Sequence, residues 1–79
     1  MKTNLLKAIN DVVNDDLSVM EQGALCHMLE DCRKKDQPES GRDFARLEYV
    51  GAIDYLWMAF RIDGDQRDLL EELPDDPEL

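Results

Sequence analysis

Hydrophobic residues near the start of the chain recur at spacings of three and four, which is the period of an amphipathic helix. Lys7, Asn10 and Asp11 would lie on the opposite, polar face. The pattern predicts a first helix over residues 3–14, closed by the polar residues 14–16. Its apolar positions are Leu5, Leu6, Ile9, Val12 and Val13.

A second helix is indicated by its first residues. Ser18 is followed three positions later by Glu21, the capping-box pattern in which each side chain bonds the backbone N–H of the other residue. The predicted helix covers residues 18–35 and ends in basic residues 33–35, whose charge suits a helix C-terminus. The short gap before it predicts an antiparallel hairpin with the first helix. Its core positions would be Leu25, Met28, Leu29 and Cys32.

The third predicted helix, residues 41–62, contains the only tryptophan, both phenylalanines and both tyrosines of the chain. Ser40 and Asp43 form a weaker capping box at its start. Apolar residues surround nearly the whole helix, so the pattern predicts burial on most sides. Charged residues such as Asp54 interrupt the run, which argues against a membrane span of about 20 apolar residues.

Small residues mark one face of the third helix at intervals of seven. Ala45, Ala52 and Ala59 alternate with Tyr49 and Leu56, as in the a and d positions of a heptad repeat. Small side chains at this spacing allow another helix to approach closely. Two heptads leave two alternatives open: a helix of the same chain packs there, or the same helix of a second protomer does.

The chain after residue 62 is expected to form a short helix over residues 66–73, capped by Asp65 and stopped by Pro74. Its apolar anchors would be Leu69, Leu70 and Leu73. The predicted fold is therefore all-α, a small helical bundle of three main helices and this short fourth one. Residues 1–73 are expected to form a single helical domain, and residues 74–79 an acidic tail.

Acidic residues outnumber basic residues and are concentrated at the end of the chain. The 79 residues include 19 acidic and 9 basic ones, for a formal net charge of −10. Residues 63–79 contain eight carboxylates against Arg67, so they carry −7 of this charge. Phosphates would repel such a surface, which argues against direct binding to nucleic acid or to an anionic membrane. The acidic end either folds against the basic residues 33–46 or contacts a partner with a basic surface.

The residue types of known catalytic and metal sites do not occur in a suitable pattern. Cys26, His27 and Cys32 would point in three directions on one helix, without a second Cys/His pair for zinc. Residues 63–74 lack the acid or amide, the Gly and the Glu that a calcium loop has at its fifth, sixth and twelfth positions. No Gly-rich phosphate loop and no nucleophile paired with a base are apparent. We therefore predict no catalytic, cofactor-binding or metal-binding residue, and expect that the protein is not an enzyme.

Two hypotheses of function follow. The first is a small acidic interaction module that inhibits or modulates a protein with a basic, nucleic-acid-handling surface, where carboxylates on a helix can imitate phosphates. In size, acidity and helical content the chain resembles phage- and mobile-element-encoded antagonists of host machinery, including DNA mimics. No family motif carries this resemblance, so it assigns no residue. The candidate partner-binding residues are Asp63, Asp65, Asp68, Glu71, Glu72, Asp75 and Asp76.

The second hypothesis is a helical homodimer that serves as an assembly, adaptor or chaperone-like protein. Its central helices would pair through a dimer seam composed of Ala45, Tyr49, Ala52, Leu56 and Ala59. The first residues show no secretory signal, and two cysteines without such a signal favour reduced thiols. A cytoplasmic location is expected under both hypotheses.

Overall fold

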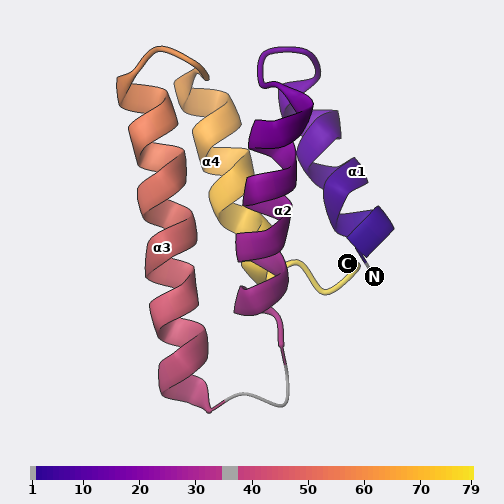
Figure 1. The fold of residues 1–79 in the computed structure, drawn as a ribbon, viewed down its shortest axis with the longest axis vertical. Coiled ribbons are helices and arrows are strands. Elements are labelled where there is room, and N and C mark those ends of the chain that lie inside the picture. Colours follow the sequence, from indigo (N-terminus) through magenta and orange to yellow (C-terminus); the bar gives the residue numbers. More distant parts are fainter. Residues whose placement is uncertain (1, 35–37) are drawn as a thin grey trace.

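A computed structural model describes residues 2–34 and 38–79, with side chains from residue 4 onward. Within these residues the chain forms four α-helices and no strand (Figure 1), which confirms an all-α fold. The α-helices are α1 (Lys2–Val13), α2 (Val19–Cys32), α3 (Glu39–Met58) and α4 (Gly64–Glu72), and the 3-10 helix η1 (Leu73–Asp75) follows α4.

The first two helices form an antiparallel hairpin (Figure 1). Residues close in sequence determine both the turn between them and the start of the second helix. Asn14, just after α1, has a φ of 50°, in the left-handed region that Asn tolerates better than most residues. The Ser18 hydroxyl accepts a bond from the backbone N–H of Glu21 at 3.1 Å. The Glu21 carboxylate accepts one from the backbone N–H of Ser18 at 2.8 Å, which lowers the pKa of Glu21. The predicted capping box is confirmed.

A buried glutamine ties this hairpin together. The side-chain amide of Gln22 donates to the backbone carbonyls of Asn14 at 2.8 Å and Leu17 at 3.1 Å. Its side-chain oxygen accepts a bond from the Asn10 amide at 3.1 Å. Because these carbonyls lie beyond the end of α1, the helix itself offers them no donor. Hydrophobic periodicity does not predict Gln22, since it reports apolar positions only.

α3 begins and ends earlier than predicted. Its N-cap is Pro38, whose fixed φ suits a helix start, and no side chain bonds a backbone N–H there. The predicted capping box of Ser40 and Asp43 is therefore wrong. The helix ends at Met58, four residues before the predicted end, and Phe60 follows with a φ of 60°.

α4 is capped two residues earlier than predicted, by Asp63 and not Asp65. The Asp63 carboxylate accepts a bond from the Gln66 backbone N–H at 2.7 Å, and the Gln66 side chain accepts one from the Asp63 N–H at 2.9 Å. The Gln66 amide also donates to the Val12 carbonyl at 3.2 Å and to the Asp16 carboxylate at 2.8 Å. Gln66 thus joins the start of α4 to the end of α1.

The core lies where α2 and α4 pass between α1 and α3 (Figure 1). Leu6 and Leu69, predicted as core residues, are partly exposed instead, because they lie at the borders of their helices' buried faces. None of the helices in the described part of the chain has the length and apolarity that a membrane crossing requires. The buried hydrophobic residues are Leu5, Ile9, Val13, Leu17, Leu25, Cys26, Leu29, Tyr49, Ile53, Ile62, Leu70 and Leu73.

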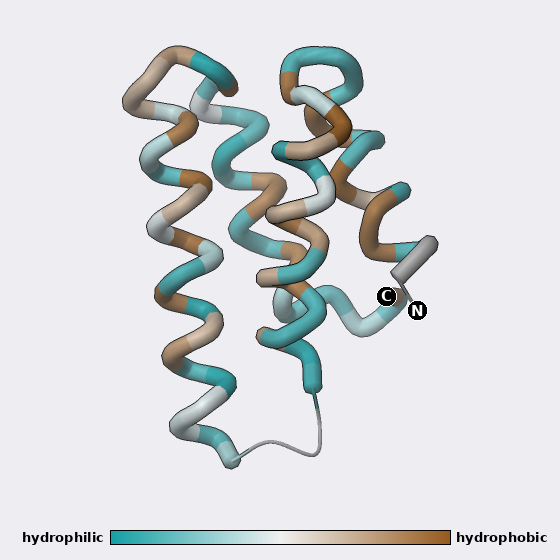
Figure 2. Tube along the Cα trace, viewed as in Figure 1, coloured by the Kyte–Doolittle hydropathy of each residue, from teal (hydrophilic) through white to brown (hydrophobic). Residues whose placement is uncertain are grey.

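The prediction that the third helix is buried on most sides is wrong. α3 lies at one edge of the fold and packs against α2 and α4 only on its inner side (Figure 1). Within α3, only Tyr49 and Ile53 are fully buried. Hydrophobic residues nevertheless recur along α3 beyond its polar first turn (Figure 2). Those expected to be buried but found exposed include Phe44, Tyr55, Trp57 and Phe60.

Replacing Tyr49 by Phe should destabilise the fold. The buried Tyr49 hydroxyl donates to the Leu70 carbonyl at 2.8 Å and so joins α3 to α4. Burial raises the pKa of Tyr49. We expect Tyr49→Phe to lower the free energy of unfolding by about 1 kcal/mol in urea titrations. Tyr55→Phe is the control, since Tyr55 is 71% exposed and should tolerate the change. Equal stability of both variants would show that the buried bond does not stabilise the protein.

Candidate interaction surfaces

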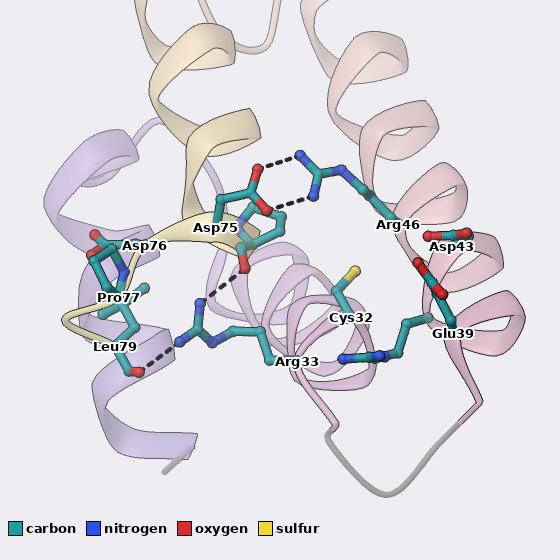
Figure 3. A pocket seen from close by; sticks show the side chains of 11 residues that line it. Cys32, Arg33, Glu39, Asp43, Arg46, Asp75, Asp76, Pro77 and Leu79 are labelled. Atoms are coloured by element: carbon teal, nitrogen blue, oxygen red, sulfur yellow. Dashed lines mark hydrogen bonds and ion pairs between the residues drawn. The ribbon is translucent and has the colours of Figure 1, made fainter.

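The acidic end of the chain is held by an arginine at the end of α2. α2 ends at Cys32, three residues before the predicted end, and Arg33 forms its C-cap. One Arg33 nitrogen donates to the carbonyls of Leu73 and Pro74 at 3.0 Å each. Another donates to Leu79 O at 2.6 Å (Figure 3). The predicted last-turn residue Lys35 lies outside the described residues.

A second arginine contacts the same segment. Both terminal nitrogens of Arg46, on α3, donate to the Asp75 carboxylate, at 2.7 and 2.6 Å (Figure 3). These two parallel bonds lower the pKa of Asp75 and raise that of Arg46. The acidic end therefore folds against the basic residues of its own chain, which was one of the two alternatives left open by the sequence.

A hollow of about 530 Å³ lies between this segment and the facing ends of α2 and α3 (Figure 3). Arg42 and Arg46 line it together with Glu39 and Asp43. The Arg42 Nε is buried without a hydrogen-bond partner among the described residues. Because both signs of charge line the hollow, its electrostatics do not select one class of ionic ligand.

The seven predicted acidic contact residues differ in their contacts within the chain. Asp63 caps α4, Asp75 pairs with Arg46, and Asp76 accepts a bond from the backbone N–H of Glu78. Glu71 is half-buried, and burial together with the nearby carboxylate of Asp54 raises its pKa. Local hydrogen bonding or partial burial thus engages these four residues, and Asp68 accepts hydrogen bonds from the neighbouring Arg67.

The remaining three share the outward side of α4. Asp65, Asp68 and Glu72 are exposed at helical spacings of three and four, with the exposed part of Leu69 between them. Asp68 bonds the neighbouring Arg67, whose guanidinium also lies 4.2 Å from the centre of the Trp57 ring. We call Asp65, Asp68 and Glu72 the acidic α4 face.

The proposed dimer seam is largely occupied within the chain. Tyr49 is fully buried, and Ala52 and Leu56 pack against the core. Ala45 is half-buried and Ala59 is exposed. This arrangement corresponds to the alternative in which helices of the same chain pack on the seam. A dimer formed through Tyr49 would require its contacts within the chain to open.

The opposite side of α3 carries large hydrophobic side chains that are exposed. Phe44, Leu47, Tyr55 and Met58 are 65–72% exposed. Together with the exposed Gly51 they follow one another at spacings of three, four, four and three, which places all five on one side of the helix. We call these five residues the apolar α3 face. Sequence analysis assigned Phe44 and Tyr55 to the core, and so missed this surface.

The residue types considered for metal binding remain apart in the fold. Cys26 is buried, Cys32 is half-buried and His27 is exposed. No cluster of three or more His, Cys, Asp or Glu residues in the described part of the chain has an arrangement suited to a metal ion. Comparisons with protein-family models, with curated proteins and with solved structures gave no significant match. Function is therefore inferred from surface chemistry alone.

Acidification should release the end of the chain. Because folding lowers the pKa of Asp75 below its ordinary value of 3.8, the carboxylate stabilises the docked end above pH 3.8. This contribution is lost as the pH falls through the lowered pKa. We expect Asp75→Asn at pH 7 to reduce the protection of the residue 76, 78 and 79 amides from hydrogen exchange, measured against the rates of unstructured peptides at the same pH. Acid should reduce this protection in the wild type. Asp65→Asn, which removes an equal charge outside the contact, should change nothing there. Equal exchange in both variants would contradict a role for the Arg46–Asp75 pair.

Proposed function

We propose that the protein is a non-enzymatic interaction module of the cytoplasm that binds a protein partner through the apolar α3 face. The observation that carries this proposal is the alignment of Phe44, Leu47, Tyr55 and Met58 on the outer side of one helix. The inner side of that helix is fixed by Tyr49 and its bond to α4. In this proposal α1, α2 and α3 are the main helices of a small bundle, and the shorter α4 packs against the inner side of α3.

The free energy of hydration favours covering this face. Four large side chains exposed by about two thirds present on the order of 500 Å² of mostly apolar surface. Each Å² removed from water contributes about 25 cal/mol. Contiguous apolar patches of several hundred Å² are typical of interaction sites on soluble proteins. An amphipathic helix with anchors at this spacing suits pairing with a helix or binding in a hydrophobic groove.

Site-specific photo-crosslinking tests this proposal. Benzoylphenylalanine at position 47, on the apolar α3 face, should give covalent adducts with protein in the cells that produce the chain. The control carries the same probe at position 6, because Leu6 is also partly exposed but lies on α1. Adducts at position 47 and not at position 6 are expected. Failure to form adducts at position 47, or equal adducts at both positions, would contradict the proposal.

A second candidate function is supported by the acidic α4 face. Asp65 and Glu72 take part in none of the ion pairs within the described residues. Their charges therefore face solvent and are available to a partner. Carboxylates at helical spacing on a protein of net charge −10 suit a basic, nucleic-acid-handling surface. The protein would then act as an inhibitor or modulator of the kind that phages and mobile elements encode.

Competition against DNA tests this second candidate. Purified protein should release DNA-binding proteins of the same cells from immobilised duplex DNA, and added salt should weaken the effect. The combined Asp65→Asn, Asp68→Asn and Glu72→Gln variant should be about tenfold or more less effective. The matched control, Asp11→Asn with Asp15→Asn and Asp43→Asn, removes three exposed charges elsewhere. Equal loss in both variants would indicate net charge alone, and would rule out a specific acidic α4 face.

A further inference from the structure

The apolar α3 face is symmetric about its central glycine. Leu47 and Tyr55 lie four residues before and after Gly51, and Phe44 and Met58 lie seven residues before and after it. A helix that binds an unrelated partner has no need of such symmetry. Two identical helices that pair antiparallel about a twofold axis do need it, because each position n then faces the position equally far on the other side of the axis.

We propose that a second copy of this chain covers the apolar α3 face, with the two α3 helices antiparallel and the twofold axis beside Gly51. The inference rests on the proposed function, since it names the partner of the same face. Leu47 of each copy then packs against Tyr55 of the other, and Phe44 packs against Met58. The two Gly51 residues meet at the axis, where the lack of side chains allows the backbones to approach closely.

A hollow lies where the N-terminal part of α3 from the second copy would reach. Trp57, Met58 and Phe60 line a hollow of about 790 Å³ at the C-terminal end of α3. In the antiparallel arrangement Met58 faces Phe44 of the second copy, so that aromatic side chain would reach this hollow. An aromatic side chain seated in a pocket is the usual form of an interface residue that contributes much of the binding free energy.

The size of the face suits a reversible dimer. The symmetric interface would bury about 1,000 Å² over both copies, near the lower limit of specific interfaces. Each copy carries a net charge of −10, and Glu48 and Asp54 border the apolar α3 face, so electrostatic repulsion opposes the dimer. Salt screens this repulsion and should therefore strengthen the dimer. Binding of a basic partner by the acidic α4 face would show the opposite dependence on salt.

Two glycines provide a matched pair of variants. Gly51 and Gly23 both lie inside helices, and a Cβ added at either would meet no atom within 4 Å. Arginine at either position should therefore leave the single chain folded and favour its helix, since glycine is a poor helix former. Both variants change the net charge equally. Only Gly51→Arg places two bulky cations at the proposed axis.

Sedimentation equilibrium over a range of protein and salt concentrations is the deciding measurement. We expect the wild type to associate from 9.1 kDa to twice that mass, more strongly at high salt. Gly23→Arg should retain this association, and Gly51→Arg should weaken it at least tenfold. Leu47→Glu and Tyr55→Lys should each be monomeric when alone and should associate when mixed, because positions 47 and 55 face each other only in the antiparallel register. Circular dichroism would establish that each variant is folded.

A wild type that stays monomeric at all concentrations, or equal association of the two glycine variants, would overturn the second copy as the occupant. The crosslinking probe at position 47 separates this failure from failure of the proposed function. An adduct with a different protein would refute the dimer alone. The absence of any adduct at position 47 would refute both proposals.

Discussion

The longest helix of the described residues, α3, lies at one edge of the fold, and this position determines the surface of the protein. α3 has 20 residues, and α2 and α4 cover only one of its sides. A chain of 79 residues buries a smaller fraction of its surface than a larger domain does. The side of α3 that receives no neighbour keeps its hydrophobic residues in water. The apolar α3 face is therefore a result of the edge position of α3 as much as of composition.

Polar side chains fix the geometry that the small core leaves open. Gln22 bonds the turn after α1, Gln66 joins α4 to α1, and Arg33 holds the last residues against α2. Two further interactions, the Arg46–Asp75 pair and the Asp63 cap, engage part of the acidic end. They reduce the charge that is available to partners. The acidic and apolar surfaces that remain lie on different helices, and they would respond to salt in opposite directions.

The features that depend on a few neighbouring residues could be predicted from the sequence. The Ser18–Glu21 capping box is one, because both bonds lie within a single turn. The burial of α3 could not be predicted in the same way, since hydrophobicity shows which residues could be covered and not which side has a neighbour. The turn residues favour Asp65 as the cap of α4, but the left-handed backbone at Phe60 ends α3 early and the helix is capped at Asp63. The hydrophobic positions of the apolar α3 face were apparent, but their exposure depends on the edge position of the helix.

The bond between Gln66 and the Val12 carbonyl has a consequence for the order of folding. It spans 54 residues, so the start of α4 reaches its final contacts only after α1, α2 and α3 have been synthesised. The hairpin of α1 and α2 closes over short loops and can form much earlier. Until α4 arrives, the inner side of α3 lacks one of its two covering helices, and Tyr49 lacks its acceptor. The chain thus exposes hydrophobic residues on both sides of α3 until α4 has docked, and such exposed surface favours aggregation during folding.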